Sequence, residues 1–280
     1  MAKAIEVRDL SYRYERSERD VLLDVNLEVE KGEFVLLTGA SGCGKTTLCR
    51  CFNGLIPHFY GGDLRGEVYV AGLSVKDTPI HKLALKVGFV FKNPDSPLFS
   101  LTVERDVAFG LENLGIDRDE MRLRVDWALK TVGMEKYRYA APYELSGGQR
   151  QRVAIAAVLA MRPEIIVLDE PTAYLDPKTA LKIFQLLDGL NKRMGLTVVL
   201  VEHRLDLVSR YASRLIIMNK GRIILDGKPS TLFHDELEEY GINVPRLVRF
   251  FRKLEEIGYE FGELPLTTDE AAEIIRRIMA

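Results

Sequence analysis

The sequence has no long apolar run, and this limits how the protein can meet a membrane. Hydrophobic residues make up 47% of its 280 residues. The longest apolar stretches, such as Val153 to Met161, are much shorter than the roughly 18 residues of a membrane-spanning helix. The amino terminus lacks the basic, apolar and small-residue blocks of a signal peptide. We therefore expect a cytosolic protein whose contact with any membrane is peripheral.

Cysteine is scarce and confined to one short segment. Cys43, Cys49 and Cys51 are the only three, and the last two should point to different sides of a single helix. This arrangement suits neither a disulfide nor a metal site. It favours small buried thiols in a reducing compartment.

Strong net charge is also absent. The formal net charge is -2 at pH 7, and the 29% of charged residues is ordinary for a globular protein. Because nucleic-acid backbones are bound by basic surfaces, this balance argues against a nucleic-acid partner. The sequence also has no internal repeat and no low-complexity tract.

What the sequence does contain is an alternation of short β-branched runs with amphipathic helical stretches. This alternation is typical of an α/β fold in which helices cover a parallel sheet. The runs are apolar nearly throughout, as expected for strands buried on both faces. The predicted strands are Phe34 to Thr38, Val87 to Phe91, Ile165 to Leu168, Thr197 to Val201 and Leu215 to Met218. The turn at 219–221 predicts a hairpin strand from Arg222 to Leu225.

A helical insertion interrupts this alternation within a main domain expected over residues 1–228. Strand signals disappear over about 94–145, where periodic segments at 102–114 and 118–132 predict a helical subdomain.

A second helical part follows the main domain. Residues 229–280 contain amphipathic segments at 245–257 and 268–279, and Thr267 with Glu270 predicts a capping box that opens the second helix. We expect a small carboxyl-terminal helical extension.

A phosphate-binding loop lies between a predicted strand and a predicted helix. Residues 39–46 fit the pattern G-x-x-x-x-G-K-[ST], whose glycines let backbone N–H groups approach phosphate oxygens at a helix amino terminus. Lys45 would neutralise the β- and γ-phosphates, and the Thr46 hydroxyl would bind Mg²⁺. The predicted ATP-binding residues here are Gly39, Ala40, Ser41, Gly42, Cys43, Gly44, Lys45, Thr46 and Thr47.

Two acidic residues end another predicted strand. Asp169 and Glu170 follow the apolar run 165–168, and their side chains should diverge because alternate residues of a strand face opposite sides. Asp169 suits the Mg²⁺ shell, and Glu170 could polarise the attacking water.

A short glycine-containing run identifies the family. Residues 145–149 read Leu-Ser-Gly-Gly-Gln and are followed by Arg-Gln-Arg, and this run resembles the signature of the ATP-binding-cassette (ABC) family. The resemblance covers about residues 1–228 and implies the family's phosphate-loop fold, with a parallel core sheet, an antiparallel β edge and a helical subdomain. It also implies a head-to-tail dimer in which the signature of one subunit closes over ATP held by the other. The signature residues are Ser146, Gly147, Gly148 and Gln149.

The resemblance assigns roles to three further residues. Tyr14, on an early strand, resembles the aromatic residue that stacks on adenine, with Tyr12 as a rival on the same face. Asp176 belongs to a segment that resembles the loop crossing the dimer interface, although Tyr174 is bulkier than the usual small residue. His203, after the strand 197–201, resembles the switch histidine that contacts the γ-phosphate and orders the water.

One residue departs from the family pattern. Lys92 stands where the family has a glutamine that helps to ligate Mg²⁺ and to place the water. Lysine has no acceptor and should repel a divalent ion unless its side chain swings out or pairs with a γ-phosphate oxygen. We therefore predict that this site binds ATP but hydrolyses it slowly. The substitution favours a heterodimer in which a partner supplies an intact site, while a homodimer stays open.

Two segments further resemble the ATPases of energy-coupling-factor importers, which take up vitamins or transition metals. They are 52–62, with Phe52-Asn53-Gly54 and Gly61-Gly62, and 93–110, with Asn93-Pro94-Asp95 and Pro97-Leu98-Phe99. The resemblance implies a second ABC ATPase subunit, a transmembrane coupling protein that docks near Lys92 to Phe99, and a substrate-binding membrane subunit. It places the chain at the cytoplasmic face of the membrane. The extension would hold the dimer together or simply cap the core.

Two functions from other classes fit the sequence less well. A soluble ABC ATPase acting on nucleic acid or ribosomes usually carries long coiled coils or a basic linker, and this chain has neither. A phosphate-loop kinase would leave the signature at 145–149 without a purpose.

Overall fold

The computed structural model describes residues 2–92, 98–233 and 235–279. The strands are β1 Lys3–Arg13, β2 Leu22–Glu30, β3 Phe34–Gly39, β4 Asp63–Val70, β5 Leu73–Ser74, β6 Val87–Val90, β7 Ile165–Asp169, β8 Thr197–Val201, β9 Arg214–Asn219 and β10 Arg222–Gly227. The α-helices are α1 Lys45–Phe52, α2 Leu55–His58, α3 Ile80–Leu83, α4 Val103–Asn113, α5 Arg118–Val132, α6 Gly147–Ala160, α7 Pro177–Met194, α8 Leu205–Val208, α9 Pro229–Leu232, α10 Arg246–Glu256 and α11 Thr268–Met279. Within these ranges, no helix is both long enough and apolar enough to span a bilayer.

The central sheet has six strands in the order β10-β9-β3-β8-β7-β6. All neighbours from β9 to β6 pair in parallel, and only β10 runs antiparallel, as a hairpin with β9. The hairpin turn places Lys220 at φ 45° and Gly221 at φ 80°, the left-handed values that a tight two-residue turn requires. The predicted parallel strands and the predicted hairpin are confirmed.

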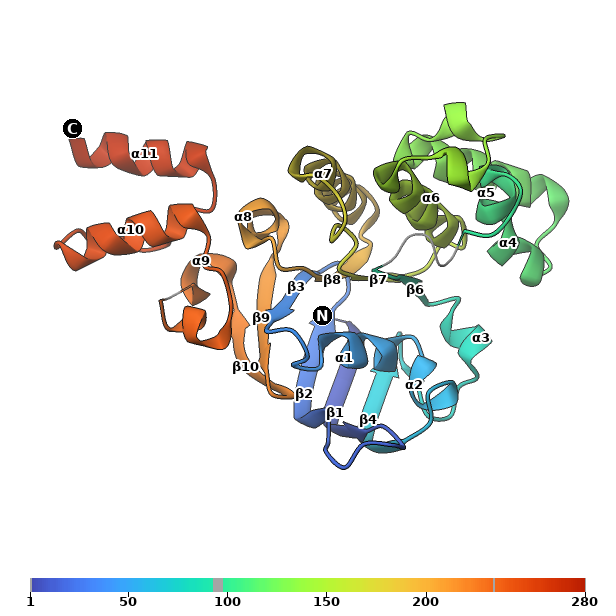
Figure 1. The fold of residues 1–280 in the computed structure, drawn as a ribbon, viewed down its shortest axis with the longest axis horizontal. Helices are drawn as coiled ribbons and strands as arrows, with labels where there is room; N and C mark the ends of the chain where they lie inside the picture. The colour runs from blue at the N-terminus through green and yellow to red at the C-terminus, as the bar shows by residue number, and fades with distance from the viewer. Residues whose placement is uncertain (1, 93–97, 234, 280) are drawn as a thin grey trace.

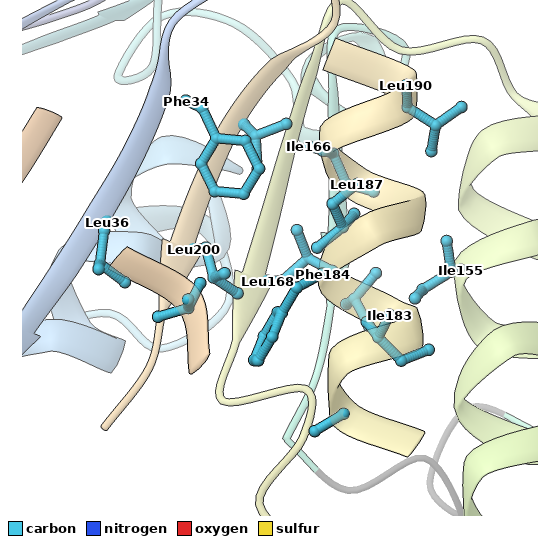
Figure 2. Packing of buried hydrophobic residues seen from close by; sticks show 14 of the residues in the cluster. Phe34, Leu36, Ile155, Ile166, Leu168, Ile183, Phe184, Leu187, Leu190 and Leu200 are labelled. Carbon is cyan, nitrogen blue, oxygen red and sulfur yellow. The ribbon is translucent and has the colours of Figure 1, made fainter. Parts of the chain in front are cut away.

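Both faces of the sheet at β3, β7 and β8 are buried, which explains why these strands are apolar at nearly every position. In β3, Phe34 and Leu36 join one hydrophobic cluster, while Val35 and Leu37 join another on the opposite face. Figure 2 shows the first face, where Phe34 and Leu36 lie on the same side as the apolar residues of α7, among them Phe184.

A second sheet covers the other face of the core. Its four strands are antiparallel in the order β2-β1-β4-β5, and their buried side chains pack in the cluster that includes α1. This sheet is the antiparallel β edge expected from the family resemblance. The cysteines Cys43, Cys49 and Cys51 are buried in the same cluster, as predicted. Burial raises the pKa of the Cys49 and Cys51 thiols, so both stay uncharged.

The helices α4, α5 and α6 form a separate group at one end of the molecule (Figure 1). The helices α4 and α5 confirm the predicted periodic segments at 102–114 and 118–132. The motif at 93–95 and Pro97 lie outside the described residues. The boundaries of 94–145 for a subdomain stay a prediction.

The helices α10 and α11 lie at the opposite end (Figure 1). Val248 and Phe251 of α10 are buried in the same cluster as the central sheet, so the extension packs on the core. The predicted capping box of α11 is present, since the Glu270 N–H donates to Thr267 Oγ1 at 3.1 Å and Glu270 Oε2 accepts from the Thr267 N–H at 3.2 Å. Phe250 of α10 stays 50% exposed.

Candidate functional site

The phosphate loop joins β3 to α1, as the motif predicts. Gly44 precedes α1 with φ 109°, a left-handed conformation that favours glycine. Lys45 is only 5% exposed, and its Nζ donates to the carbonyl oxygens of Gly39 at 2.8 Å and Ala40 at 2.9 Å. In the described chain no carboxylate pairs with this ammonium, whose other partner is Cys43 Sγ. A buried cation held only by neutral groups at a helix amino terminus fits an anionic ligand such as a phosphate.

Asp169 lies at the end of β7, next to this loop. It is 6% exposed, and its buried Oδ1 has no hydrogen-bond partner among the described residues. Burial raises the pKa of the Asp169 carboxyl, and an interaction with the Thr46 hydroxyl partly offsets that increase. A hydroxyl and an orphaned carboxylate oxygen are the hard oxygen donors that Mg²⁺ takes from proteins, so Thr46 and Asp169 fit this ion.

Glu170 turns away from Asp169, as predicted, and contacts the side chains of Lys92 and His203. Its backbone is left-handed, with φ 48°, and its N–H donates to the Val201 carbonyl at 3.0 Å. Glu170 Oε2 lies 2.6 Å from Lys92 Nζ, and Oε1 lies 3.1 Å from His203 Nε2. Both carboxylate oxygens therefore contact side chains that follow other strands, Lys92 after β6 and His203 after β8.

The pKa of Glu170 reflects these contacts. Burial acts to raise the pKa of the carboxyl, but the hydrogen bond from Lys92 and the nearby His203 outweigh it, so the pKa lies below its usual range. The same hydrogen bond raises the pKa of the Lys92 ammonium. The sequence offered two positions for Lys92, swung outward or bound to a γ-phosphate oxygen. The structure shows a third, an ion pair with Glu170.

The aromatic residues near β1 are not equivalent. Tyr12 is fully buried, and its hydroxyl donates to the Gly61 carbonyl at 2.7 Å, so it has no surface for a ligand. Tyr14 is half-buried and lies one residue past the end of β1, not on the strand as expected. Its hydroxyl lies 3.2 Å from Thr47 Oγ1, which places the ring beside α1. The structure thus favours Tyr14 over Tyr12 for stacking on a base.

The signature opens α6. Ser146 and Gln149 form a capping box, in which Gln149 Oε1 accepts from the Ser146 N–H at 2.8 Å. Gly148 is buried, and a Cβ there would lie 2.4 Å from the Thr179 side chain of α7, so only glycine allows this packing. Ser146 is exposed at the helix amino terminus, where backbone N–H groups can bind an anion. Figure 1 shows α6 and α1 in different parts of the molecule, so the two glycine-containing helix amino termini lie apart within the chain.

The predicted interface loop precedes α7. Asp176 caps this helix by accepting from the N–H groups of Lys178 and Thr179, both at 3.0 Å. Its contact with Thr179 lowers the pKa of the carboxyl. Tyr174 is 72% exposed, and the Leu175 carbonyl accepts from Arg204 Nη1 at 2.7 Å. This hydrogen bond ties the loop to the segment that carries His203.

Sequence reasoning missed three residues that border the site. Glu202 is 2% exposed and hydrogen-bonds the loops that carry Glu170 and His203. Arg50 lies over the ring of Tyr60, with 4.4 Å from its Cζ to the ring centroid, and donates to the Tyr14 hydroxyl at 3.2 Å. Glu202 could have been found from the sequence, because it is an acid directly before His203. The contact between Arg50 and Tyr60 could not, because it joins α1 to the segment before β4 and no sequence motif links the two.

Comparisons with known proteins agree with this geometry. Residues 22–173 match the family model described as ABC transporter. The chain is 45% identical over 274 residues to a protein described as an ABC transporter ATP-binding protein of Pyrococcus horikoshii, covering 97% of this chain and 96% of that one. It is 43% identical to the energy-coupling factor transporter ATP-binding protein EcfA1 of Clostridium novyi, over 95% of each chain. It spans only 43% of a longer relative from Methanosarcina mazei, at 47% identity.

Solved structures show the same likeness. CbiO1 from Clostridium perfringens, part of the ABC transporter complex CbiONQ, is 35% identical with a TM-score of 0.77, covering 91% of this chain and all of that one. The cassette MJ0796, solved as a dimer bound to ADP and Pi, is 34% identical with a TM-score of 0.70, covering 80% of this chain and 98% of that one. The chain belongs to the ABC transporter ATPase family. It is an ATP-binding and ATP-hydrolysing protein with the fold that the resemblance predicted, and its likeness to energy-coupling-factor ATPases is confirmed.

Proposed function

We propose that this chain is the ATP-hydrolysing subunit of an energy-coupling-factor importer, acting at the cytoplasmic face of the cell membrane. The observation that carries this proposal is the extent of the similarity to the Clostridium novyi relative. That similarity covers 95% of this chain and therefore includes most of the carboxyl-terminal extension, well past the family model's last matched residue at 173. The transported solute, a vitamin or a transition-metal ion, would be selected by a separate membrane subunit.

The residues around the phosphate loop would bind and orient ATP. Lys45 holds the β- and γ-phosphates, and the loop's N–H groups bind their oxygens. Thr46 and Asp169 would hold Mg²⁺, which when bound neutralises charge that builds up on the phosphates. Tyr14 would stack on the base, since its ring is half-buried beside α1.

Glu170 and His203 would act on the attacking water. Glu170 Oε1 and His203 Nε2 lie 3.1 Å apart, so one water can contact both the carboxylate and the imidazole. Glu170 accepts a hydrogen bond from the water and increases its nucleophilicity, while His203 orients it toward the γ-phosphate.

A second ABC ATPase subunit would complete the site. The amino terminus of α6, with Ser146, Gly147 and Gly148, lies apart from α1 in the same chain (Figure 1). It therefore would bind the triphosphate of a partner subunit, with Asp176 in the loop between the two sites. The dimer is either homomeric or heteromeric, and the extension would contribute to it through the exposed Phe250.

We predict that Lys92→Gln raises the turnover rate about two- to fivefold, the effect of removing one partly exposed ion pair from the reacting carboxylate. Lys92 is 47% exposed and occupies Glu170 Oε2, an oxygen that the water needs. Phosphate release at saturating ATP measures the change. Lys86→Gln is the matched control, because Lys86 forms an ion pair of the same length with Glu164 elsewhere. An unchanged or lower rate in Lys92→Gln would contradict the prediction.

The docking surface for the coupling protein would include Phe99. It is 64% exposed, stacks edge-on with Phe109 at 4.8 Å, and lies beside Leu101, which is 75% exposed. Asp106 Oδ1 fixes this segment by accepting from the Phe99 N–H at 3.1 Å. Exposed apolar side chains on a segment held by this hydrogen bond suit a helix of a membrane partner.

Purification in a mild detergent tests the proposed function. We expect a polytopic membrane protein to accompany the chain, and Phe99→Asp to reduce its recovery at least about tenfold without changing the ATPase rate of the isolated subunit. Met194→Asp, at another exposed apolar residue, should leave recovery unchanged. Recovery of the chain with ribosomes or nucleic acid instead would overturn the importer assignment.

A further inference from the structure

Glu202 is a buried acid that the proposed chemistry does not use. It follows β8 directly and is 2% exposed. Its Oε1 accepts hydrogen bonds from the backbone N–H groups of His203 at 2.8 Å and Arg204 at 3.2 Å. Its Oε2 accepts from the hydroxyl of Thr172. No cation pairs with this carboxylate among the described residues, so neutral donors alone satisfy both oxygens.

A buried carboxylate of this kind is costly unless its oxygens are all hydrogen-bonded. An apolar residue would fill the position without that cost. The contacts of Glu202 therefore point to a purpose beyond packing, and they join two loops that both enter the site.

Those two loops carry the residues that act on water. Thr172 belongs to the loop after β7, two residues beyond Glu170, and His203 belongs to the loop after β8. The strands β7 and β8 are parallel neighbours, so their loops leave the same edge of the sheet. Backbone hydrogen bonds hold the start of each loop, since the Glu170 N–H donates to the Val201 carbonyl and the Glu202 N–H donates to the Leu37 carbonyl. Beyond these points, the Glu202 side chain is a direct bridge between the loops.

We propose that Glu202 is a positioning residue that sets the distance and direction of His203 relative to Glu170. The proposal rests on the proposed roles of those two residues in hydrolysis. Glu202 acts by fixing the backbone of the switch loop at His203 and Arg204 and by anchoring that backbone to Thr172. The His203 imidazole then reaches Glu170 Oε1 at 3.1 Å without further adjustment.

This role predicts a loss in turnover and not in ATP binding. A displacement of about 1 Å in a reacting arrangement lowers a rate on the order of a hundredfold. The residues proposed to hold the triphosphate lie on the phosphate loop and α1, and within the described chain none of them is hydrogen-bonded to the Glu202 side chain. Glu202→Ala should therefore lower kcat about ten- to a hundredfold while ATP affinity changes less than about twofold.

A double-mutant cycle distinguishes positioning from general stabilisation. If Glu202 acts through His203, then adding Glu202→Ala to His203→Ala should lower kcat less than about twofold further. Glu202→Gln should retain most of the activity, because its amide oxygen accepts both backbone N–H groups and its amide nitrogen donates to Thr172 Oγ1. Glu33→Ala is the matched control, since Glu33 also accepts a backbone N–H, at 2.8 Å, but immediately precedes β3, away from the two loops. It should leave kcat unchanged.

Thr172→Val keeps the test valid if Glu202→Ala does not fold. Valine has the shape of threonine without its hydroxyl, so it removes the bridge alone, and kcat should fall about threefold or more while Thr172→Ser restores it. Three results would overturn the proposal. They are fully multiplicative effects of Glu202→Ala and His203→Ala on kcat, a loss of kcat in Glu202→Gln as large as that in Glu202→Ala, and an unchanged kcat in Thr172→Val. An unchanged kcat in His203→Ala itself would instead overturn the proposed function of that histidine.

Discussion

Replacing Glu170 with glutamine is expected to abolish steady-state ATP hydrolysis while leaving ATP bound. A positioned general base contributes about 10²- to 10⁴-fold to a rate, and the amide of glutamine cannot accept a proton from water. The side-chain size is unchanged, and glutamine can adopt the same backbone conformation at φ 48° as glutamate. Phosphate release measures the loss.

The same variant should trap the closed dimer. ATP that is not hydrolysed keeps the signature of one subunit on the phosphates of the other, so size-exclusion chromatography with ATP and Mg²⁺ should show a stable dimer. Glu164→Gln is the matched control, because Glu164 is also paired with a lysine, at 2.6 Å, but lies outside the site. A Glu170→Gln protein that hydrolyses ATP at the unmodified rate, or that stays monomeric with ATP, would contradict this assignment.

Lys45→Ala is expected to lower ATP affinity about thirtyfold or more, the effect of removing one partner from a buried charged contact. Lys45 Nζ is held by two loop carbonyls and is buried beside the proposed phosphate positions. Isothermal calorimetry with ATP and Mg²⁺ measures the affinity. The fold should survive, because the lysine has no carboxylate partner in the described chain that would be left unpaired.

The matched control for Lys45 is Lys192→Ala. Lys192 lies on α7 and forms an exposed ion pair with Asp188 four residues earlier, so its loss should change ATP affinity less than about twofold. Equal uptake of ATP by Lys45→Ala and the unmodified chain would show that triphosphate binds elsewhere.

Structural elements were predicted correctly from the sequence where they depend on contiguous residues or on hydrophobic periodicity. The strand that begins at Phe34 was predicted because nearly all of its residues are apolar, and they are apolar because the sheet is covered on both faces. The phosphate loop was predicted because its glycines, lysine and threonine are contiguous and their spacing is set by backbone geometry. The capping box at Thr267 was predicted for the same reason.

Side-chain positions were not predicted from the sequence where they depend on contacts between distant segments. It treated Tyr12 and Tyr14 as rivals, but Tyr12 is buried through a hydrogen bond to Gly61, 49 residues away. It expected Lys92 to meet a phosphate or solvent, whereas Lys92 contacts Glu170. Neither outcome is encoded in the spacing of neighbouring residues.

By itself, the sequence determined the family, the order of the central-sheet strands along the chain and the identity of the phosphate loop, because these depend on contiguous motifs and on hydrophobic periodicity. Only the tertiary structure decided how Glu170 is held between Lys92 and His203 and how Glu202 joins their loops. Those contacts depend on the parallel pairing of β6, β7 and β8, which brings the ends of strands far apart in the sequence to one edge of the sheet.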